Sequence, residues 1–376
     1  MKIQILQENL NRGLSTSFRT ISTKAQLPVL ANVLLKADKN GLQISATNLE
    51  TGINIKLGAK VEEEGEITIP AKILTEVVSS LPAEKIDLES KENSLKISTN
   101  GYEASFNGIP AAEFPKLPTY LPESLFSLPS EKFLESINQV AFAAATDEGR
   151  PVLTGVLVKI ERKNLSLVAT DGYRLSLKTL EIDMEVKEKI SLLLPAKSLM
   201  EMARILSENK DEKEKTVKMG FTKEQNQVVF VFPEMELFSR LIEGDFPAYE
   251  KIIPQNLSTK IILDREGFSR EVKIVSLFAR DSANIIKFKV QKGSLEMSAN
   301  SPQIGENKSS LEAKLEGDEG EIAFNFRFLQ GFIGAVTKPE ISLEINGPLS
   351  PGAFRMVGDD SFLHIIMPVR LQTEEK

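Results

Sequence analysis

The sequence predicts an α+β fold built from three repeated domains, each with two helices packed on antiparallel sheets. Stretches of the chain recur in the same order, which indicates an internal repeat. Runs of alternating apolar and polar residues also follow one another directly, with polar turns between them. In a doubly wound fold a helix would separate each strand from the next, so antiparallel sheets are expected instead.

The first half of the repeat is visible in two segments, 27–36 (LPVLANVLLK) and 150–159 (RPVLTGVLVK). In both copies the proline lies 19 residues before a threonine that ends the next strand-like run. A weaker third copy covers residues 283–300. So many matches in one order are not expected by chance.

The second half of the repeat also recurs. Residues 67–74 (ITIPAKIL) match 192–199 (LLLPAKSL), and 322–329 (IAFNFRFL) keep the pattern without the proline. The first two units then close on EFP at 113–115 and DFP at 245–247. The predicted domains are residues 1–121, 122–251 and 252–376.

Each unit is expected to open with an amphipathic helix. Apolar residues recur at helical spacing over 10–21, 133–144 and 268–278, with Ser130 as a predicted N-cap in the second unit. A strand is then expected to lead into a second helix at Pro70 and at Pro195, where a proline loses no helical hydrogen bond.

The composition excludes several classes of protein. Of 376 residues, 53 are acidic and 46 basic, which gives a net charge of −7. Cysteine is absent and His364 is the single histidine, so disulfides, cysteine nucleophiles and His/Cys zinc clusters are excluded. No apolar run is long enough for a membrane span and the N-terminus lacks a signal-peptide core. We expect a cytoplasmic protein with no cofactor, no metal and no membrane partner.

Two further motifs, ATDGYRL at 169–175 and MPVRL at 367–371, complete a resemblance. With the repeat, they make the sequence resemble the bacterial sliding clamp family, the β subunit of DNA polymerase III, over nearly the whole chain. The resemblance implies a homodimer, joined head to tail into a ring around duplex DNA. It implies a processivity subunit without catalytic residues, bound by the polymerase catalytic subunit, the clamp loader and other proteins through a short peptide.

An acidic chain can still slide on DNA if a few basic residues line the hole, because phosphate neutralisation sets the strength of non-specific binding. Lys72, Lys197 and Arg327 occupy equivalent places in the three repeats, and Arg204 shares a helix face with Lys197. The resemblance carries DNA contact to Lys24 as well as to Lys72 and Lys197. Taken singly, these residues also fit ordinary solvated faces.

The resemblance further implies a peptide-binding pocket between the second and third units. An apolar cleft would seat the peptide's large residues, with Arg174 or Arg370 anchoring a polar group; taken singly, the apolar residues also fit a plain core. The implied pocket residues are Leu153, Thr170, Gly172, Tyr173, Arg174, Leu175, Pro247, Lys251, Ile252, Asn325, Phe328, Ile366, Met367, Pro368, Val369 and Arg370.

The implied dimer contact pairs the outer strand of the first unit, around Ala104 and Phe106, with Leu277 and Phe278 of the third. Phe278 also fits the apolar stripe of its helix, so a core position is the alternative.

Two rival classes of protein also fit some of these residues. Asp147, Glu148 and Asp171 could form a metal or acid–base cluster of an enzyme, although acidic pairs in loops are usually just solvated. A repeat-built scaffold that binds no DNA is the other alternative. A nucleotide-binding role is disfavoured because no glycine-rich phosphate loop is present.

Overall fold

The structure is a computed structural model, and it describes residues 1–21, 27–120, 122, 125–208, 215–222, 226–255, 258–281 and 283–370. The chain forms two compact units. Unit 1 comprises Met1–Leu128 and Thr216–Leu241, and unit 2 comprises Pro129–Lys215 and Ile242–Lys376. The central repeat therefore contributes to both units.

The described residues of unit 1 form two α-helices and two antiparallel sheets. Its helices are α1 (Gln7–Phe18) and α2 (Ala71–Ser80). A five-stranded sheet has the order β5 (Lys60–Glu63), β1 (Lys2–Leu6), β7 (Lys85–Lys91), β8 (Ser94–Thr99), β9 (Tyr102–Asn107). An eight-stranded sheet has the order β10 (Phe126–Pro129), β13 (Thr216–Phe221), β14 (Gln227–Phe232), β15 (Met235–Arg240), β4 (Thr51–Leu57), β3 (Gly41–Thr47), β2 (Asn32–Asp38), β6 (Gly65–Pro70).

In the described part of unit 2 there are four α-helices and two more antiparallel sheets. The helices are α3 (Ser130–Val140), α4 (Ala196–Glu208), α5 (Arg265–Ala279) and α6 (Phe326–Ala335). A seven-stranded sheet has the order β11 (Gly155–Thr170), β12 (Arg174–Pro195), β24 (Asp359–Ile366), β23 (Gly352–Met356), β22 (Glu340–Ile345), β16 (Thr259–Asp264), β20 (Lys314–Gly317). A four-stranded sheet has the order β19 (Gly305–Glu312), β18 (Ser294–Ser301), β17 (Ile285–Gln291), β21 (Gly320–Asn325).

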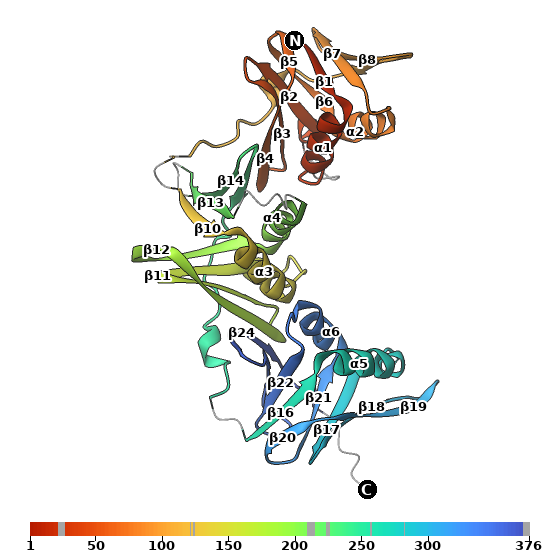
Figure 1. Ribbon diagram of the computed structural model, residues 1–376, viewed down its shortest axis with the longest axis vertical. Coiled ribbons are helices and arrows are strands. Elements are labelled where there is room, and N and C mark those ends of the chain that lie inside the picture. Colours follow the sequence, from red (N-terminus) through yellow and green to blue (C-terminus); the bar gives the residue numbers. More distant parts are fainter. Residues whose placement is uncertain are drawn as a thin grey trace. The chain divides into compact units, whose positions relative to one another are not determined.

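The predicted fold class is confirmed. In the described ranges every strand pairing is antiparallel, and the two helices of each repeat contact each other, α1 with α2, α3 with α4 and α5 with α6 (Figure 1). Pro70 is the N-cap of α2, and Pro195 ends β12 just before α4, as the sequence predicts. The predicted N-cap Ser130 is wrong by one position, because Pro129 takes that place without a side-chain hydrogen bond.

The core under α5 and α6 is a chain of phenylalanine rings. Phe288 meets Phe268 and Phe324 edge-on, with centroids 6.0 and 5.5 Å apart. Phe354 in turn contacts Phe324 and Phe332 at 5.5 and 5.1 Å. Edge-to-face pairs add to the stabilisation that burial already supplies, so this cluster holds both helices on the sheets.

Two strand pairs join the central repeat to its neighbours. In unit 1, β15 pairs with β4 over five residue pairs, from Thr51–Ser239 to Ile55–Met235. In unit 2, β12 pairs with β24 over five residue pairs, from Arg174–Ile366 to Lys178–Phe362. We call these the β4–β15 joint and the β12–β24 joint.

Among the described residues, no helix has the length and apolar character needed to cross a membrane.

Candidate functional site

The turn between β11 and β12 is held in one shape by its own side chains. Asp171 Oδ1 accepts the backbone N–H groups of Tyr173 and Arg174 at 2.9 and 3.0 Å. Thr170 Oγ1 accepts the N–H of Gly172 at 3.0 Å and donates to the Arg174 carbonyl at 2.6 Å. Gly172 has a φ of +92°, which side chains disfavour. The motif ATDGYRL is therefore a rigid turn that leaves Tyr173 61% exposed.

The C-terminal segment runs from this turn to the third repeat. The Met367 N–H donates to the Tyr173 carbonyl, and the Val369 N–H donates to the Ala323 carbonyl of β21, both at 2.8 Å. Met367 and Arg370 are exposed, whereas Pro368 and Val369 are half-buried. The two hydrogen bonds bring residues 367–370 beside the turn, although the two segments are far apart in the sequence, and Leu371 lies outside the described residues.

The start of α6 completes this group. Asn325 caps the helix, because its side-chain oxygen accepts the Arg327 N–H at 3.0 Å. One turn on, the Phe328 ring stacks with the Tyr173 ring, with centroids 6.4 Å apart and planes 17° apart. The structure thus gathers the turn, the C-terminal segment and the start of α6.

The guanidinium of Arg174 is engaged by other groups of the protein. Its Nε donates to Asp171 at 3.0 Å and one terminal nitrogen donates to the Phe142 carbonyl at 2.7 Å. The guanidinium also lies over the rings of Phe142 and Phe328, 5.4 and 5.0 Å from their centroids. Of the two arginines predicted to anchor a polar group, Arg370 is the exposed one.

The β12–β24 joint separates residues that the sequence had grouped. Leu175 lies opposite Ile365, and both belong to an apolar cluster on one face of the sheet. Ile366 lies opposite Arg174 and belongs to the phenylalanine-rich cluster on the other face. Residues that pair directly across two strands share a face, so Ile365 is the companion of Leu175 that sequence reasoning missed.

The segment that follows β15 covers the Leu175 face. It carries Pro247, Lys251 and Ile252, all exposed, while Tyr249 is buried in the Leu175 cluster. Half-buried Leu153 lies beside Val152, which packs against the same cluster. Tyr249 was not predicted, yet its place two residues after Pro247 is a signal that could have found it.

The predicted basic residues lie at matching helix positions. Lys72, Lys197 and Arg327 are each the second residue of α2, α4 and α6, and each is exposed. Arg204 is exposed and its Nε lies 3.1 Å from Glu208 Oε1 one turn along α4. Lys24 lies outside the described residues.

Of the predicted dimer residues, Leu277 is exposed and Phe278 is half-buried against the phenylalanine-rich cluster. Ala104 and Phe106 lie two residues apart on β9 and therefore share a face of the sheet. Ala104 pairs with Ile97 of β8, Phe106 pairs with Leu95, and Phe106 is buried. β9 is an edge strand of its sheet, and β19, against which α5 packs, is an edge strand of another.

His364 is the most perturbed titratable group described. Its Nδ1 shares a 2.7 Å hydrogen bond with Ser176 Oγ, and its Nε2 is buried without a partner among the described residues. Its ring lies 5.3 Å from that of Phe142 and 5.6 Å from that of Phe332. Burial, with the nearby charge of Arg174, lowers the pKa of His364 to about 3, so the imidazole is neutral at physiological pH.

The acidic residues of the rival enzyme hypothesis do not gather. Within the described ranges, no three Asp, Glu or His side chains are placed to hold a metal ion. Asp171 shapes the β11–β12 turn, and Glu148 lies 3.8 Å from Lys197 on the surface.

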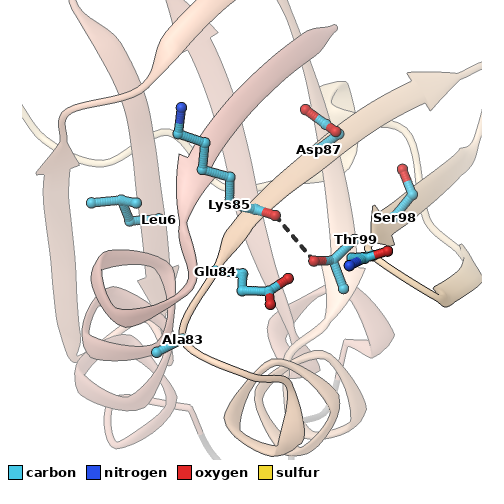
Figure 2. A pocket seen from close by; sticks show the side chains of 8 residues that line it. Leu6, Ala83, Glu84, Lys85, Asp87, Ser98 and Thr99 are labelled. Carbon is cyan, nitrogen blue, oxygen red and sulfur yellow. Dashed lines mark hydrogen bonds between the residues drawn. The ribbon is translucent and has the colours of Figure 1, made fainter.

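A hollow of about 530 Å³ opens at one end of the five-stranded sheet in unit 1 (Figure 2). The Thr99 hydroxyl donates to the Lys85 carbonyl at 3.1 Å across it (Figure 2). It is lined by Leu6, Ala83, Glu84, Lys85, Asp87, Ser98, Thr99 and Asn100. None of the predicted site residues lines it.

The repeated helix-and-sheet domains place the chain with the DNA polymerase sliding clamps among solved structures. Solved clamps from Bacillus subtilis and Thermotoga maritima superpose with TM-scores of 0.93 and 0.91, at 28% and 27% identity. These matches cover 99% and 98% of this chain, and 99% of each solved chain.

The sequence comparisons agree over the full length. The beta sliding clamp of Synechocystis is 31% identical over 393 residues, covering 99% of this chain and all of that protein. Models of the N-terminal, central and C-terminal domains of the DNA polymerase III beta subunit match residues 1–118, 127–248 and 250–370. The chain belongs to the DNA polymerase III beta subunit family.

Proposed function

We propose that the chain is a DNA sliding clamp of the bacterial cytoplasm. Two copies join head to tail into a ring around duplex DNA, and the ring tethers the replicative polymerase and other replication and repair proteins. The observation that carries the proposal is one exposed cation at the second residue of α2, α4 and α6, in a chain that matches sliding clamps throughout. In this proposal the chain is a processivity subunit without catalytic residues of its own.

The sparse cations suit sliding. A cation at a helix start adds to the positive end of the helix dipole, and both attract phosphate. Each neutralised phosphate strengthens non-specific binding, so a fully basic lining would hold the DNA in place. A net charge of −7 with one recurring cation per repeat favours a ring that topology retains on DNA.

The dimer contact is proposed at the free strand edges. β9, which carries Ala104 and Phe106, and β19, beside the helix that carries Leu277 and Phe278, both offer unpaired backbone groups. Pairing such edges between two copies would satisfy those groups and cover exposed Leu277. Because the two edges lie on different repeats, the contact is heterologous, and two such contacts related by a twofold rotation would close a ring of two copies.

The peptide site is proposed around the β11–β12 turn, the C-terminal segment, the start of α6 and the segment after β15. Exposed Tyr173, Ile252 and Met367 offer apolar surface there, and Arg370 offers a charge. Methionine adapts to several partners.

We also propose domain boundaries near residues 121 and 251.

The test of the clamp function is topological. A clamp loader should place the protein on a nicked circular plasmid, where it should survive salt that strips ordinary basic proteins. Cutting the plasmid once should release it, because the ring slides off an end. Gel filtration of protein with circular or linear plasmid measures this, and equal retention on both would contradict the proposal.

A charge variant tests the lining in the same assay. Lys72→Glu with Lys197→Glu and Arg327→Glu should impair loading while the dimer mass stays unchanged. The matched control is Lys91→Glu with Lys187→Glu and Lys289→Glu, which changes the net charge equally at exposed strand positions. Equal loading of the two triple variants would show that the three helix residues are ordinary solvated residues without a role in loading.

A further inference from the structure

The segment 243–255, which lies between β15 and β16, is tied to the rest of unit 2 through side chains in the contacts described for it. The backbone hydrogen bonds described for residues 243–255 all stay inside the segment, around the 3-10 helix Tyr249–Lys251. The Tyr249 ring is buried among apolar residues of the seven-stranded sheet. Within the described ranges, one side chain outside the segment hydrogen-bonds to it, and that side chain is Lys159 of β11.

Lys159 makes three contacts with the segment at once. Its Nζ lies 2.7 Å from Glu250 Oε1 and 3.2 Å from the Tyr249 hydroxyl. It also lies 4.5 Å from the centre of the Tyr249 ring, within the range of a cation–π contact. The Lys159 side chain is 20% exposed and the Glu250 side chain is 57% exposed, so solvent partly screens the ion pair, and Tyr249 is the buried partner of Lys159.

The charges of this group are stable at neutral pH. Burial opposes the charge on Lys159, but the hydrogen bonds to Glu250 and Tyr249 outweigh it and raise the pKa of Lys159. The hydrogen bond from Lys159 lowers the pKa of Glu250. Burial raises the pKa of Tyr249, which keeps its hydroxyl protonated. The ammonium, the carboxylate and the neutral phenol therefore persist together.

The position of Lys159 has a counterpart in the first repeat, where the lysine makes different contacts. Lys36 is the repeat counterpart of Lys159, since both end the matched ten-residue segments. Its Nζ lies 3.9 Å from Glu66 on a neighbouring strand, and its side chain is half exposed. The segment after the first repeat is held differently, because the Tyr120 hydroxyl donates to Glu236 at 3.2 Å.

We propose that Lys159 is a positioning residue for partner-peptide binding. By holding Tyr249 and Glu250, it fixes the short helix Tyr249–Lys251. Lys251 and the flanking residues Pro247 and Ile252 form one wall of the proposed peptide site. This inference rests on the proposed function, because it assumes that the site takes a peptide. Lys159 itself acts through the segment and need not touch the ligand.

The first experiment is a fluorescence anisotropy titration with a labelled short peptide that holds one glutamine and two large apolar residues. Lys159→Met keeps the aliphatic stem and loses the charge, and it should weaken binding about tenfold, the scale of one charged hydrogen bond. Lys159→Arg restores the charge and should recover binding to within about threefold. Lys36→Met, the repeat counterpart, should bind like the wild type.

The second experiment follows the segment directly. Because the chain has no cysteine, a single Ala248→Cys substitution accepts one nitroxide label at an exposed position. Adding Lys159→Met should make the label more mobile in its electron paramagnetic resonance spectrum, whereas adding Lys36→Met should not. Dimer mass is measured on every variant to confirm assembly.

The outcomes separate the two proposals. If the wild type binds the peptide and Lys159→Met binds it equally well, the positioning role is overturned and the proposed function stands. If Lys159→Met weakens binding but Lys159→Arg does not recover it and the label spectrum is unchanged, the positioning role is overturned as well. If the wild type itself binds no peptide, both the peptide site and this inference are overturned.

Discussion

The two joints share one backbone arrangement but carry opposite side-chain chemistry. β4 and the start of β12 are repeat counterparts, and each pairs with a later strand over five residue pairs. Where the β4–β15 joint has the buried apolar pair Ile53–Leu237, the β12–β24 joint has the buried polar pair Ser176–His364. The repeat thus preserves register while the side chains diverge.

On the other face of the sheet the difference runs the opposite way, with the polar pair in the β4–β15 joint and the apolar pair in the β12–β24 joint. Asn54 lies opposite Glu236 in the β4–β15 joint, and their side chains are 3.2 Å apart. The corresponding pair of the β12–β24 joint is Leu177 and Leu363. At this position only the β12–β24 joint has an apolar pair, and the segment 246–253 covers that face. This difference is the reason that the peptide site is proposed at the β12–β24 joint.

The strongest way to break the comparison is to remove the C-terminal segment. Deleting residues 367–376 removes the hydrogen bonds to Tyr173 and Ala323 and the exposed Met367. We expect peptide affinity to fall at least about a hundredfold, which is close to 3 kcal/mol. The ring should still form, because the proposed dimer contacts lie on β9, β19 and α5.

The matched control for this deletion removes only residues 371–376 and should bind the peptide normally. Anisotropy titration measures affinity and light scattering measures the dimer. If the longer deletion binds as tightly as the intact chain, the peptide site is misplaced.

A second test creates one cavity in each joint. Leu237→Ala and Leu363→Ala each remove one buried leucine side chain, from β15 and from β24, and each should lower the unfolding free energy by about 2–5 kcal/mol. Urea unfolding measures the loss. Only Leu363→Ala should also weaken peptide binding, by several-fold, because Leu363 underlies the apolar face near Tyr249. Equal effects of both variants on peptide affinity would show that the two joints do not differ in this respect.

The smallest expected effect at neutral pH comes from moving the chemistry of one joint into the other. Ser176→Ile with His364→Leu gives the β12–β24 joint an apolar pair, and at pH 7.5 the unfolding free energy should change by less than about 1 kcal/mol, because both polar partners are removed together.

Acid should reveal the difference. In the folded protein the pKa of His364 is lowered to about 3, against an ordinary value of 6.5. The unfolded chain therefore binds the proton first, and stability falls as the pH drops below about 6.5. The wild type should lose about 1.4 kcal/mol more than the double variant between pH 7.5 and pH 5.5. Parallel stability curves for the two proteins would contradict a buried neutral histidine.

Much of the fold could be predicted from the sequence because it depends on local patterns. Helical spacing predicted the cores of α1, α3 and α5, and the recurring proline predicted where α2 and α4 begin. The equivalence of Lys72, Lys197 and Arg327 also follows from the repeat, and the structure puts each at the second residue of its helix.

The site was less accessible to this reasoning. Arg174 was expected to anchor a ligand, but its guanidinium is engaged by Asp171 and Phe142, which no spacing rule reveals. Ile365 was missed in favour of Ile366, since β24 is buried on both faces and its apolar run carries no alternation. Where both neighbours are apolar, periodicity cannot assign a face.

The sequence by itself determined the threefold repeat, the α+β class and the order of the elements, because these depend on residues close together in the chain. Tertiary structure alone decided that the central repeat contributes strands to both units, and that Lys159 reaches Tyr249 and Glu250 about ninety residues away. Contacts between residues so far apart in the chain depend on which faces of the sheets can be buried together. No local pattern in the sequence specifies those faces.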